Sequence, residues 1–168
     1  NITGSLNVNA YKNRKNNSIK NNIFNYNNEG IHILHSMNME ISNNKFCKNM
    51  GKCITNKYSF KTQINDNFIE GCFNTSIMLL NCFKTSIIDN NIYDVWNCGI
   101  CSITSPHTLI QNNNLTDINE RSYNGYGNGV SSSSVDGYGE TNGNNLIGDG
   151  SIIIKGKTLE NANYWITT

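Results

Sequence analysis

Glu70, Asp94 and Asp117 are the residues whose type and spacing best suit catalysis. Glu70 and Asp94 each follow an apolar residue, Ile69 and Tyr93, in a pattern that repeats about every 23 residues. If each repeat forms one coil, Glu70 and Asp94 lie on adjacent coils with backbones about 5 Å apart, and Asp117 lies near the next coil.

Carboxylates at such distances suit glycoside hydrolysis. Retaining glycosidases hold two carboxyl groups about 5 Å apart, and inverting enzymes hold them about 6.5 to 9.5 Å apart. Glu70 with Asp94 fits the first arrangement, and either of them with Asp117 fits the second. The alternative interpretation is that all three are solvated carboxylates in polar turns.

Aromatic and polar residues on the same side of the repeat indicate a sugar-binding surface. Trp96, Tyr123 and Tyr126 are expected to be exposed, with Glu120 and Arg121 beside them on a Gly- and Tyr-rich segment. An aromatic ring packs on the apolar face of a pyranose while polar neighbours bind the hydroxyls. These five residues are therefore the predicted ligand-binding set.

Six cysteines offer thiols but no metal-site or disulfide spacing that can be read from the sequence. Cys98 and Cys101 form a Cys-x-x-Cys, yet a zinc site needs a second pair, and His32, His35 and His107 stand at no ligand spacing from it. We expect small buried or half-buried thiols, no metal and no cofactor.

Net charge and hydropathy limit the possible partners. Lys and Arg number 13 against 12 Asp and Glu, a formal net charge of +1, so no basic tract is available for nucleic acid. No apolar run approaches the roughly 20 residues of a membrane-spanning helix. We expect neither nucleic acid binding nor membrane insertion.

The repeat itself determines the expected fold. Val8, Ile31, Ile54, Ile77 and Ile100 are spaced by 23 residues, and Ile41, Ile64, Ile87 and Ile110 keep the same interval, with Ile19 one residue out of step. A third series joins Asn21, Asn44, Asn67, Asn90 and Asn113. Asn makes up about a fifth of the chain, a content that often indicates disorder. Here we expect the side-chain amides of Asn22, Asn44, Asn67 and Asn90 to stack at a turn, which accounts for the high Asn content in a folded chain.

Short alternating segments separated by Asn, Ser and Gly predict strands of three to five residues joined by turns. A period of about 23 residues with only such strands predicts an all-β right-handed parallel β-helix of about seven coils. We expect one domain over residues 1–168, with coils over about 1–115, a loop excursion over 116–129 and final coils over 130–168, as a piece of a longer chain.

The segment Gly-Ile-His-Ile-Leu-His-Ser-Met-Asn-Met-Glu-Ile-Ser-Asn-Asn, residues 30–44, resembles the repeat of the pectin-lyase-like family of right-handed β-helices. The resemblance extends from about Val8 to Ile153 and implies acidic or surface polysaccharides as ligands. Bacteriophage tailspikes and tail fibres are its most similar members. The polygalacturonase motifs are missing, Ser105-Pro106-His107 lacks the carboxylate of the epimerases, and the only arginines are Arg14 and Arg121, which disfavours a lyase.

Three functions remain open. The first is a virion-tail or cell-surface β-helix, commonly a homotrimer, that binds host cell-surface polysaccharide. The second is a polysaccharide depolymerase, a glycosidase or lyase that uses Glu70, Asp94 and Asp117. The third is a structural spacer whose turns bind nothing.

Overall fold

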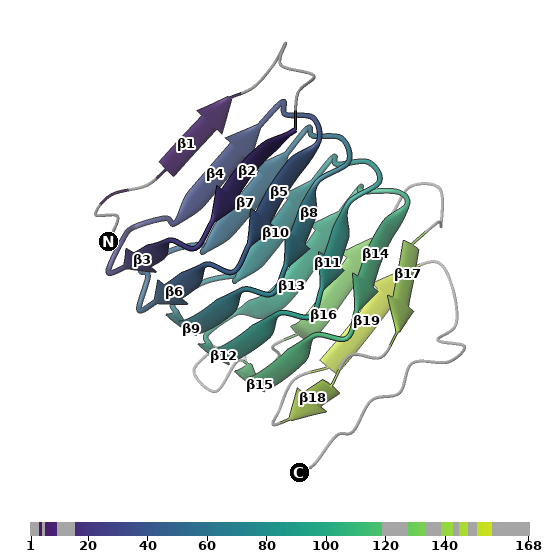
Figure 1. Cartoon of the computed structure of the whole chain (residues 1–168). Coiled ribbons are helices and arrows are strands. Elements are labelled where there is room, and N and C mark those ends of the chain that lie inside the picture. The colour runs from purple at the N-terminus through teal and green to yellow at the C-terminus, as the bar shows by residue number, and fades with distance from the viewer. Residues whose placement is uncertain are drawn as a thin grey trace.

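The computed structural model describes residues 4, 6–9 and 16–118, and the backbone of later strands at 128–133, 139–142, 145–147 and 151–155. The strands form three parallel sheets, and the chain visits sheets 1, 2 and 3 in turn before it returns to sheet 1 one coil further on (Figure 1). The expected all-β right-handed parallel β-helix is confirmed.

Sheet 1 contains seven strands, which lie side by side in chain order. They are β1 (Leu6–Asn9), β4 (Ile31–Leu34), β7 (Ile54–Lys57), β10 (Ile77–Leu80), β13 (Cys98–Ile103), β16 (Asn128–Ser133) and β19 (Ser151–Lys155).

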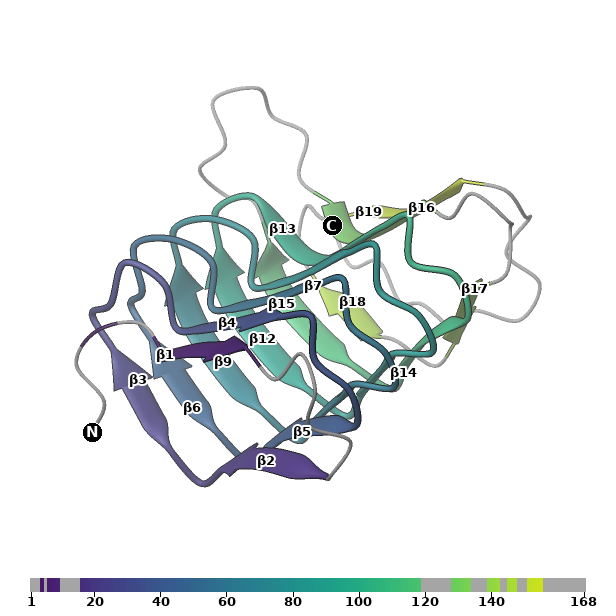
Figure 2. The same cartoon turned by 90° about the horizontal axis from the view of Figure 1, so that it is seen from above.

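Sheets 2 and 3 contain six strands each. Sheet 2 is formed by β2 (Asn17–Lys20), β5 (Met39–Ser42), β8 (Gln63–Asn65), β11 (Ser86–Ile88), β14 (Thr108–Gln111) and β17 (Gly139–Asn142). Sheet 3 is formed by β3 (Ile23–Asn25), β6 (Lys45–Cys47), β9 (Phe68–Cys72), β12 (Asn91–Val95), β15 (Asn114–Ile118) and β18 (Asn145–Ile147). Figure 2 shows the same coils from above, stepping from the purple end to the yellow end.

The core consists of apolar residues that stack on their equivalents in neighbouring coils. Each sheet contributes at least one such column, and every member named here is at most 1% exposed. The columns are Ile31, Ile54, Ile77 and Ile100 in sheet 1; Ile41, Ile64, Ile87 and Ile110 in sheet 2; and Phe46, Ile69, Ile92 and Leu115 in sheet 3. This stacking buries a continuous narrow interior, which is the main source of stability in a solenoid.

The corner between sheets 2 and 3 is held by an asparagine ladder, formed by Asn22, Asn44, Asn67, Asn90 and Asn113. Within it the Asn67 amide nitrogen donates to Asn90 Oδ1 at 3.0 Å and to the Ile41 carbonyl at 2.9 Å. Asn90 Oδ1 also accepts the backbone N–H of Asn67 at 3.0 Å. The expected stacked amides are thus confirmed, with Asn22 rather than Asn21 as the first member.

The corners share a second feature, a left-handed backbone conformation. Every described non-glycine residue with positive φ falls in one of four columns, each with one position per coil. The columns are Asn21, Asn43, Asp66, Asp89 and Asn112; Tyr26, Lys48, Asp94 and Asp117; His35, Tyr58, Asn81 and Thr104; and Asn38, Lys61, Lys84 and His107. Such a residue costs about 1 kcal/mol or more unless it is Gly, Asn or Asp. At these corners the backbone N–H donates to the next coil, as Asp66 does to the Ile88 carbonyl at 3.2 Å.

The observed register departs from the expected series at both ends. Leu6, not Val8, faces Ile31, and Ile152, not Ile153, faces Val130, after a register shift in β16. Ile19 faces Ile41, so the first step is 22 residues. The strands amount to about six turns, about five of them in residues 16–118, slightly fewer than the seven expected.

Candidate functional site

The outer face of sheet 3 carries a pair of aromatic rings, Phe68 on β9 and Tyr93 on β12, which we call the ring platform. Their centroids lie 5.4 Å apart and their planes are tilted by 34°. Both rings point outward because they alternate along the strands with the buried Ile69 and Ile92. The ammonium of Lys45 lies 5.3 Å from the centroid of Phe68.

Amide groups border the ring platform. The Asn114 side-chain nitrogen donates to the hydroxyl of Tyr93 at 3.2 Å and to Asn91 Oδ1 at 3.4 Å. The Tyr93 hydroxyl donates to Asn91 Oδ1 at 3.5 Å. Two rings beside exposed amides provide both an apolar surface and hydrogen-bonding groups, which is what a sugar requires.

Glu70 lies on β9 at the edge of the platform, exposed to solvent. Its partners in register are Cys47 on β6 and Tyr93 on β12, so the predicted pairing of Glu70 with Asp94 is wrong by one residue. The error arose because Tyr93 was assigned to the inward apolar column, whereas Ile92 occupies it.

The Cys47 thiol lies 4.0 Å from Glu70 Oε2. Burial raises the pKa of Cys47, the Lys45 ammonium opposes this effect, and the Glu70 carboxylate adds to it.

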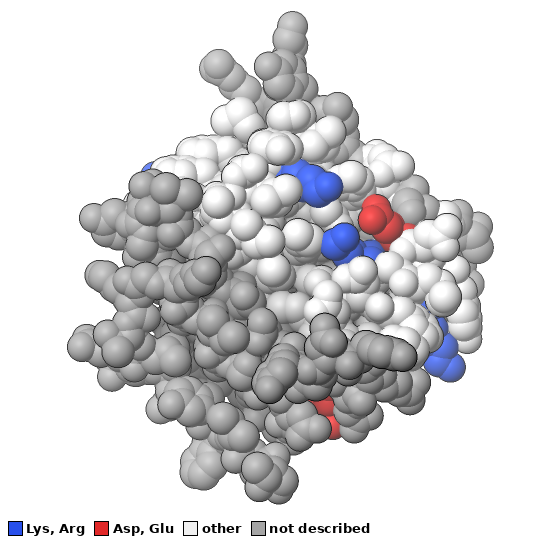
Figure 3. Space-filling view, turned by 180° about the vertical axis from the view of Figure 1, so that it is seen from behind, with Lys and Arg blue, Asp and Glu red and all other residues white. Residues whose placement is uncertain are grey.

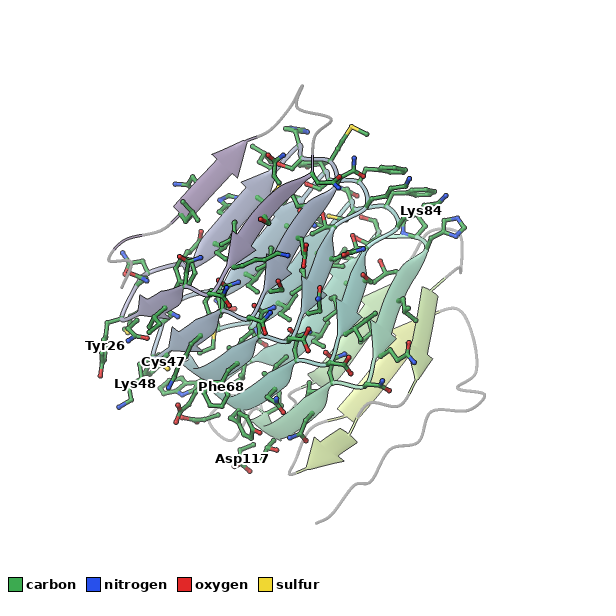
Figure 4. All side chains as sticks on the ribbon, in the orientation of Figure 1. Tyr26, Cys47, Lys48, Phe68, Lys84 and Asp117 are labelled. Carbon is green, nitrogen blue, oxygen red and sulfur yellow. The ribbon has the colours of Figure 1, made fainter. Side chains whose placement is uncertain are left out.

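Asp94 and Asp117 are the carboxylates that meet on adjacent coils. Strands β12 and β15 pair Tyr93 with Thr116 and Val95 with Ile118, which places Asp94 opposite Asp117 at a spacing of about 4.8 Å between backbones. Both residues have a left-handed backbone, with φ of 47° and 52°. Figure 4 shows Asp117 at the same outward edge as Tyr26, Lys48 and Phe68. The register therefore pairs Asp94 with Asp117 and not with Glu70.

The other predicted ligand-binding residues have different outcomes. Trp96 is half-buried, and its ring packs at 4.5 Å between centroids and 52° between planes against Phe73. Glu120, Arg121, Tyr123 and Tyr126 lie outside the described residues. β15 continues to Ile118, three residues into the predicted excursion.

A second surface, on sheet 2, was missed by the sequence reasoning. It is a polar hollow of about 250 Å³ whose lining includes Glu40, Lys61, Gln63 and Lys84. Beside it the rings of Phe60 and Phe83 stack at 5.5 Å, with the ammonium groups of Lys61 and Lys84 over them at 5.4 and 5.6 Å. The spacing of 23 residues between the two Phe-Lys pairs was the signal for this stack.

The lining of the hollow includes three charged residues, Glu40, Lys61 and Lys84. A hydrogen bond from Lys20, 2.7 Å long, lowers the pKa of Glu40. Seen from behind, the described part of the surface is mostly uncharged, with a few basic and acidic side chains (Figure 3).

Sulfur-containing residues occupy two neighbouring strands of sheet 1, β10 and β13. Met78 on β10 faces Cys101 on β13 in register. A hydrogen bond with the Cys98 thiol lowers the pKa of Cys101 to about 7, against the opposite effect of burial. Over the described part of the chain, no group of three or more His, Cys, Asp or Glu residues could hold a metal ion. Cys98, Cys101 and Met78 provide soft sulfur donors on these two neighbouring strands.

Comparison with known proteins gives a family. A family model described as periplasmic copper-binding protein (NosD) matches residues 3–168. No curated protein and no solved structure matches the chain. Among the described residues, no helix has the length and apolar character needed to span a membrane. The match agrees with the expected β-helix repeat family and with a location outside the cytoplasm, and because it covers nearly all of the sequence, the chain belongs to the NosD family.

Proposed function

We propose that the chain is an extracytoplasmic β-helix protein that binds polysaccharide through the outer face of sheet 3. The observation that carries this proposal is the ring platform of Phe68 and Tyr93, with rings 5.4 Å apart and bordered by Asn91, Asn114 and Glu70. Exposed aromatic residues beside carboxylate and amide groups on a rigid scaffold are typical of glycan recognition.

The β-helix suits an extended ligand. Successive coils place equivalent outward positions about 4.8 Å apart along the axis, so a linear glycan lying along sheet 3 meets a new set of side chains at each coil. The rings would pack on the apolar faces of the sugars. The Asn91 and Asn114 amides and the Glu70 carboxylate would bind hydroxyl groups.

The test is retention of the purified full chain on capsular and cell-wall polysaccharides. We expect Tyr93→Ala to weaken binding by roughly tenfold, since one aromatic contact is worth about 1.5 kcal/mol. Phe60→Ala is the matched control, because this ring also stacks on a neighbouring ring but lies by the hollow on sheet 2. Binding that is lost in Phe60→Ala and kept in Tyr93→Ala would move the site to the hollow, and no retention of the wild type would leave a structural spacer.

The enzymatic alternative is favoured by the pairing of Asp94 with Asp117. Carboxyl groups about 5 to 5.5 Å apart are typical of retaining glycosidases, and the register places these two residues on adjacent coils. In this alternative Asp94→Asn and Asp117→Asn abolish release of reducing ends while retention persists. Retention without release in the wild type excludes the depolymerase and keeps the binding protein.

Copper is the second candidate ligand, because the family is described as copper-binding. The thiols of Cys98 and Cys101 and the thioether of Met78 would hold Cu(I), since soft sulfur donors select this ion. The observation that favours the site is the alignment of Met78 with Cys101, whose thiol interacts with that of Cys98.

Anaerobic titration of the full chain with Cu(I) against a chromogenic chelator tests this site. We expect one bound ion, with ultraviolet thiolate-to-copper absorbance, and weaker binding in Cys101→Ser and Met78→Leu. Cys82→Ser is the control, because that thiol is buried and hydrogen-bonded to the Asn56 carbonyl. Equal affinity in all variants would rule out the proposed ligands.

Two further expectations concern assembly and location. We propose a homotrimer, as is common for surface β-helices, and analytical ultracentrifugation of the full chain measures it. A position on a virion tail stays a prediction, which immunolabelling of particles against cell envelopes checks.

A further inference from the structure

Two buried cysteines, Cys53 and Cys72, meet inside the β-helix. Their sulfur atoms lie 2.8 Å apart. A disulfide bond is about 2.0 Å long, so a small movement would bring the two atoms to bonding distance. Both residues are fully shielded from solvent, with 0% exposure.

The two cysteines lie at opposite ends of one coil. Cys53 immediately precedes β7, and Cys72 is the last residue of β9. Between them the chain passes through all three sheets, so the two residues mark the start and the end of a single turn. The two cysteines are 19 residues apart in sequence, and a bond between them would close this coil into a covalent ring.

Neighbouring groups hold both sulfur atoms in place. Cys72 Sγ lies 3.0 Å from the Gly51 carbonyl, and the Asn49 side-chain nitrogen lies 3.7 Å from Cys53 Sγ. The backbone of Gly51 in turn passes close to the Asn28 carbonyl of the preceding coil, which leaves no room for a Cβ at this position. The pair is therefore pre-positioned by the fold.

We propose that Cys53 and Cys72 form a disulfide that closes this coil. The inference rests on the extracytoplasmic location proposed above, where oxidising conditions prevail. A small-molecule or protein disulfide is the oxidant: one cysteine thiolate attacks it and releases one thiol, and the second cysteine then displaces the other thiol to form the Cys53–Cys72 bond. Each cysteine loses one proton, and the oxidant gains two electrons and two protons.

The pKa values of the two thiols are shifted in opposite directions in the closed coil. The hydrogen bond donated by Cys53 lowers the pKa of Cys72, whereas burial raises the pKa of Cys53 well above its usual range. In the closed coil Cys72 therefore has the larger thiolate fraction. Because both sulfurs are enclosed in the finished coil, the bond forms while the coil is closing rather than afterwards.

Peptide mapping tests the cross-link directly. The full chain carrying Cys82→Ser is reduced, denatured and refolded with oxidised and reduced glutathione, and its free thiols are then alkylated. Trypsin releases Cys53 in peptide 53–57 and Cys72 in peptide 62–84, which otherwise also contains Cys82. We expect these two peptides to be joined, at a mass two hydrogens below the sum of the free forms.

A stability comparison on unsubstituted chain separates a structural bond from an accidental one. Oxidised protein should unfold with an equilibrium constant on the order of a hundredfold smaller than protein kept in a phosphine reductant, because a loop of this length is closed. Peptide 53–57 recovered alkylated, or joined to another cysteine, overturns the proposal, as does an oxidised form no more stable than the reduced form. Neither readout involves glycan, so failure of the polysaccharide proposal leaves this result unaffected.

Discussion

Replacement of Asn90 by alanine should destabilise the protein far more than its single amide group suggests. Asn90 Oδ1 accepts the backbone N–H and the side-chain amide of Asn67, both at 3.0 Å. Its own nitrogen donates to the Ile64 carbonyl at 2.9 Å and to Asn113 Oδ1 at 2.9 Å. One side chain thus connects three consecutive coils in a dry corner.

The expected loss follows from these contacts. The alanine variant leaves the buried N–H of Asn67 without its acceptor, which costs about 2 kcal/mol, and the other lost bonds add about 1 kcal/mol net. A total of about 3 kcal/mol is a large part of the 5–15 kcal/mol by which a domain is stable. With a urea dependence of about 2 kcal/mol per molar, the unfolding midpoint should fall by about 1.5 M.

Urea unfolding followed by circular dichroism measures this shift. Asn91→Ala is the matched control, since Asn91 is the next residue, has the same side chain and is exposed, so its loss should change stability by no more than about 0.5 kcal/mol. Asn90→Asp separates hydrogen bonding from packing, because it keeps an acceptor for Asn67 but cannot donate to Ile64 or Asn113. Equal midpoints for the variants of Asn90 and Asn91 would refute the ladder as a source of stability.

Three other perturbations test separate features. Gly51→Ala should lower the melting temperature by the equivalent of about 1–3 kcal/mol, since its Cβ would lie 2.2 Å from the Asn28 carbonyl oxygen, whose backbone position cannot yield. Asn56→Leu should raise stability by about 1–2 kcal/mol in urea unfolding, because this fully buried amide finds no hydrogen-bond partner among the described residues and its neighbours in the column are apolar. Cys47 should react with iodoacetamide at pH 8 more slowly than a free cysteine, because its raised pKa lowers the thiolate fraction, and Glu70→Gln should speed the reaction; an unchanged rate would show that Glu70 exerts no charge effect there.

Most of the interior was predictable from the sequence because most inward positions accept only apolar side chains, although Asn56 and Ser102 interrupt one inward column of sheet 1. Ile54, Ile77 and Ile100 recur at one interval because each must fill the same space under the next. The same holds for the ladder, in which an amide must both donate and accept. Repetition of this strength predicts the coil without knowledge of any related protein.

The site was predicted less well, because an outward aromatic residue is chemically indistinguishable from an inward one in the sequence. Tyr93 was assigned to the core column, which shifted the expected pairing of Glu70 by one residue. Counting from the ladder corrects this error: Ile92 follows Asn90 by two positions, as Ile69 follows Asn67. The ladder, not the apolar series, was the safer reference for the register.

The contact between Cys53 and Cys72 lay beyond any sequence pattern. Their separation of 19 residues is shorter than the repeat, so they occupy different columns and share no register position. They meet only because a closed coil returns its end to its start. A contact of this kind follows from the three-dimensional path of one turn, which the repeat length alone does not specify.

The separation of repeated and varied columns indicates where function can arise in such a fold. The inward column of sheet 3 stays apolar through Phe46, Ile69, Ile92 and Leu115, and the ladder stays Asn, since any change there weakens several coils at once. The outward column one residue further on contains Cys47, Glu70, Tyr93 and Thr116, four different chemistries on one rigid frame. Because the corners and the core already determine the backbone, these outward side chains can change without loss of the fold. A binding site on a β-helix is therefore to be sought in the columns that break the repeat, and on this chain one such column runs beside the ring platform.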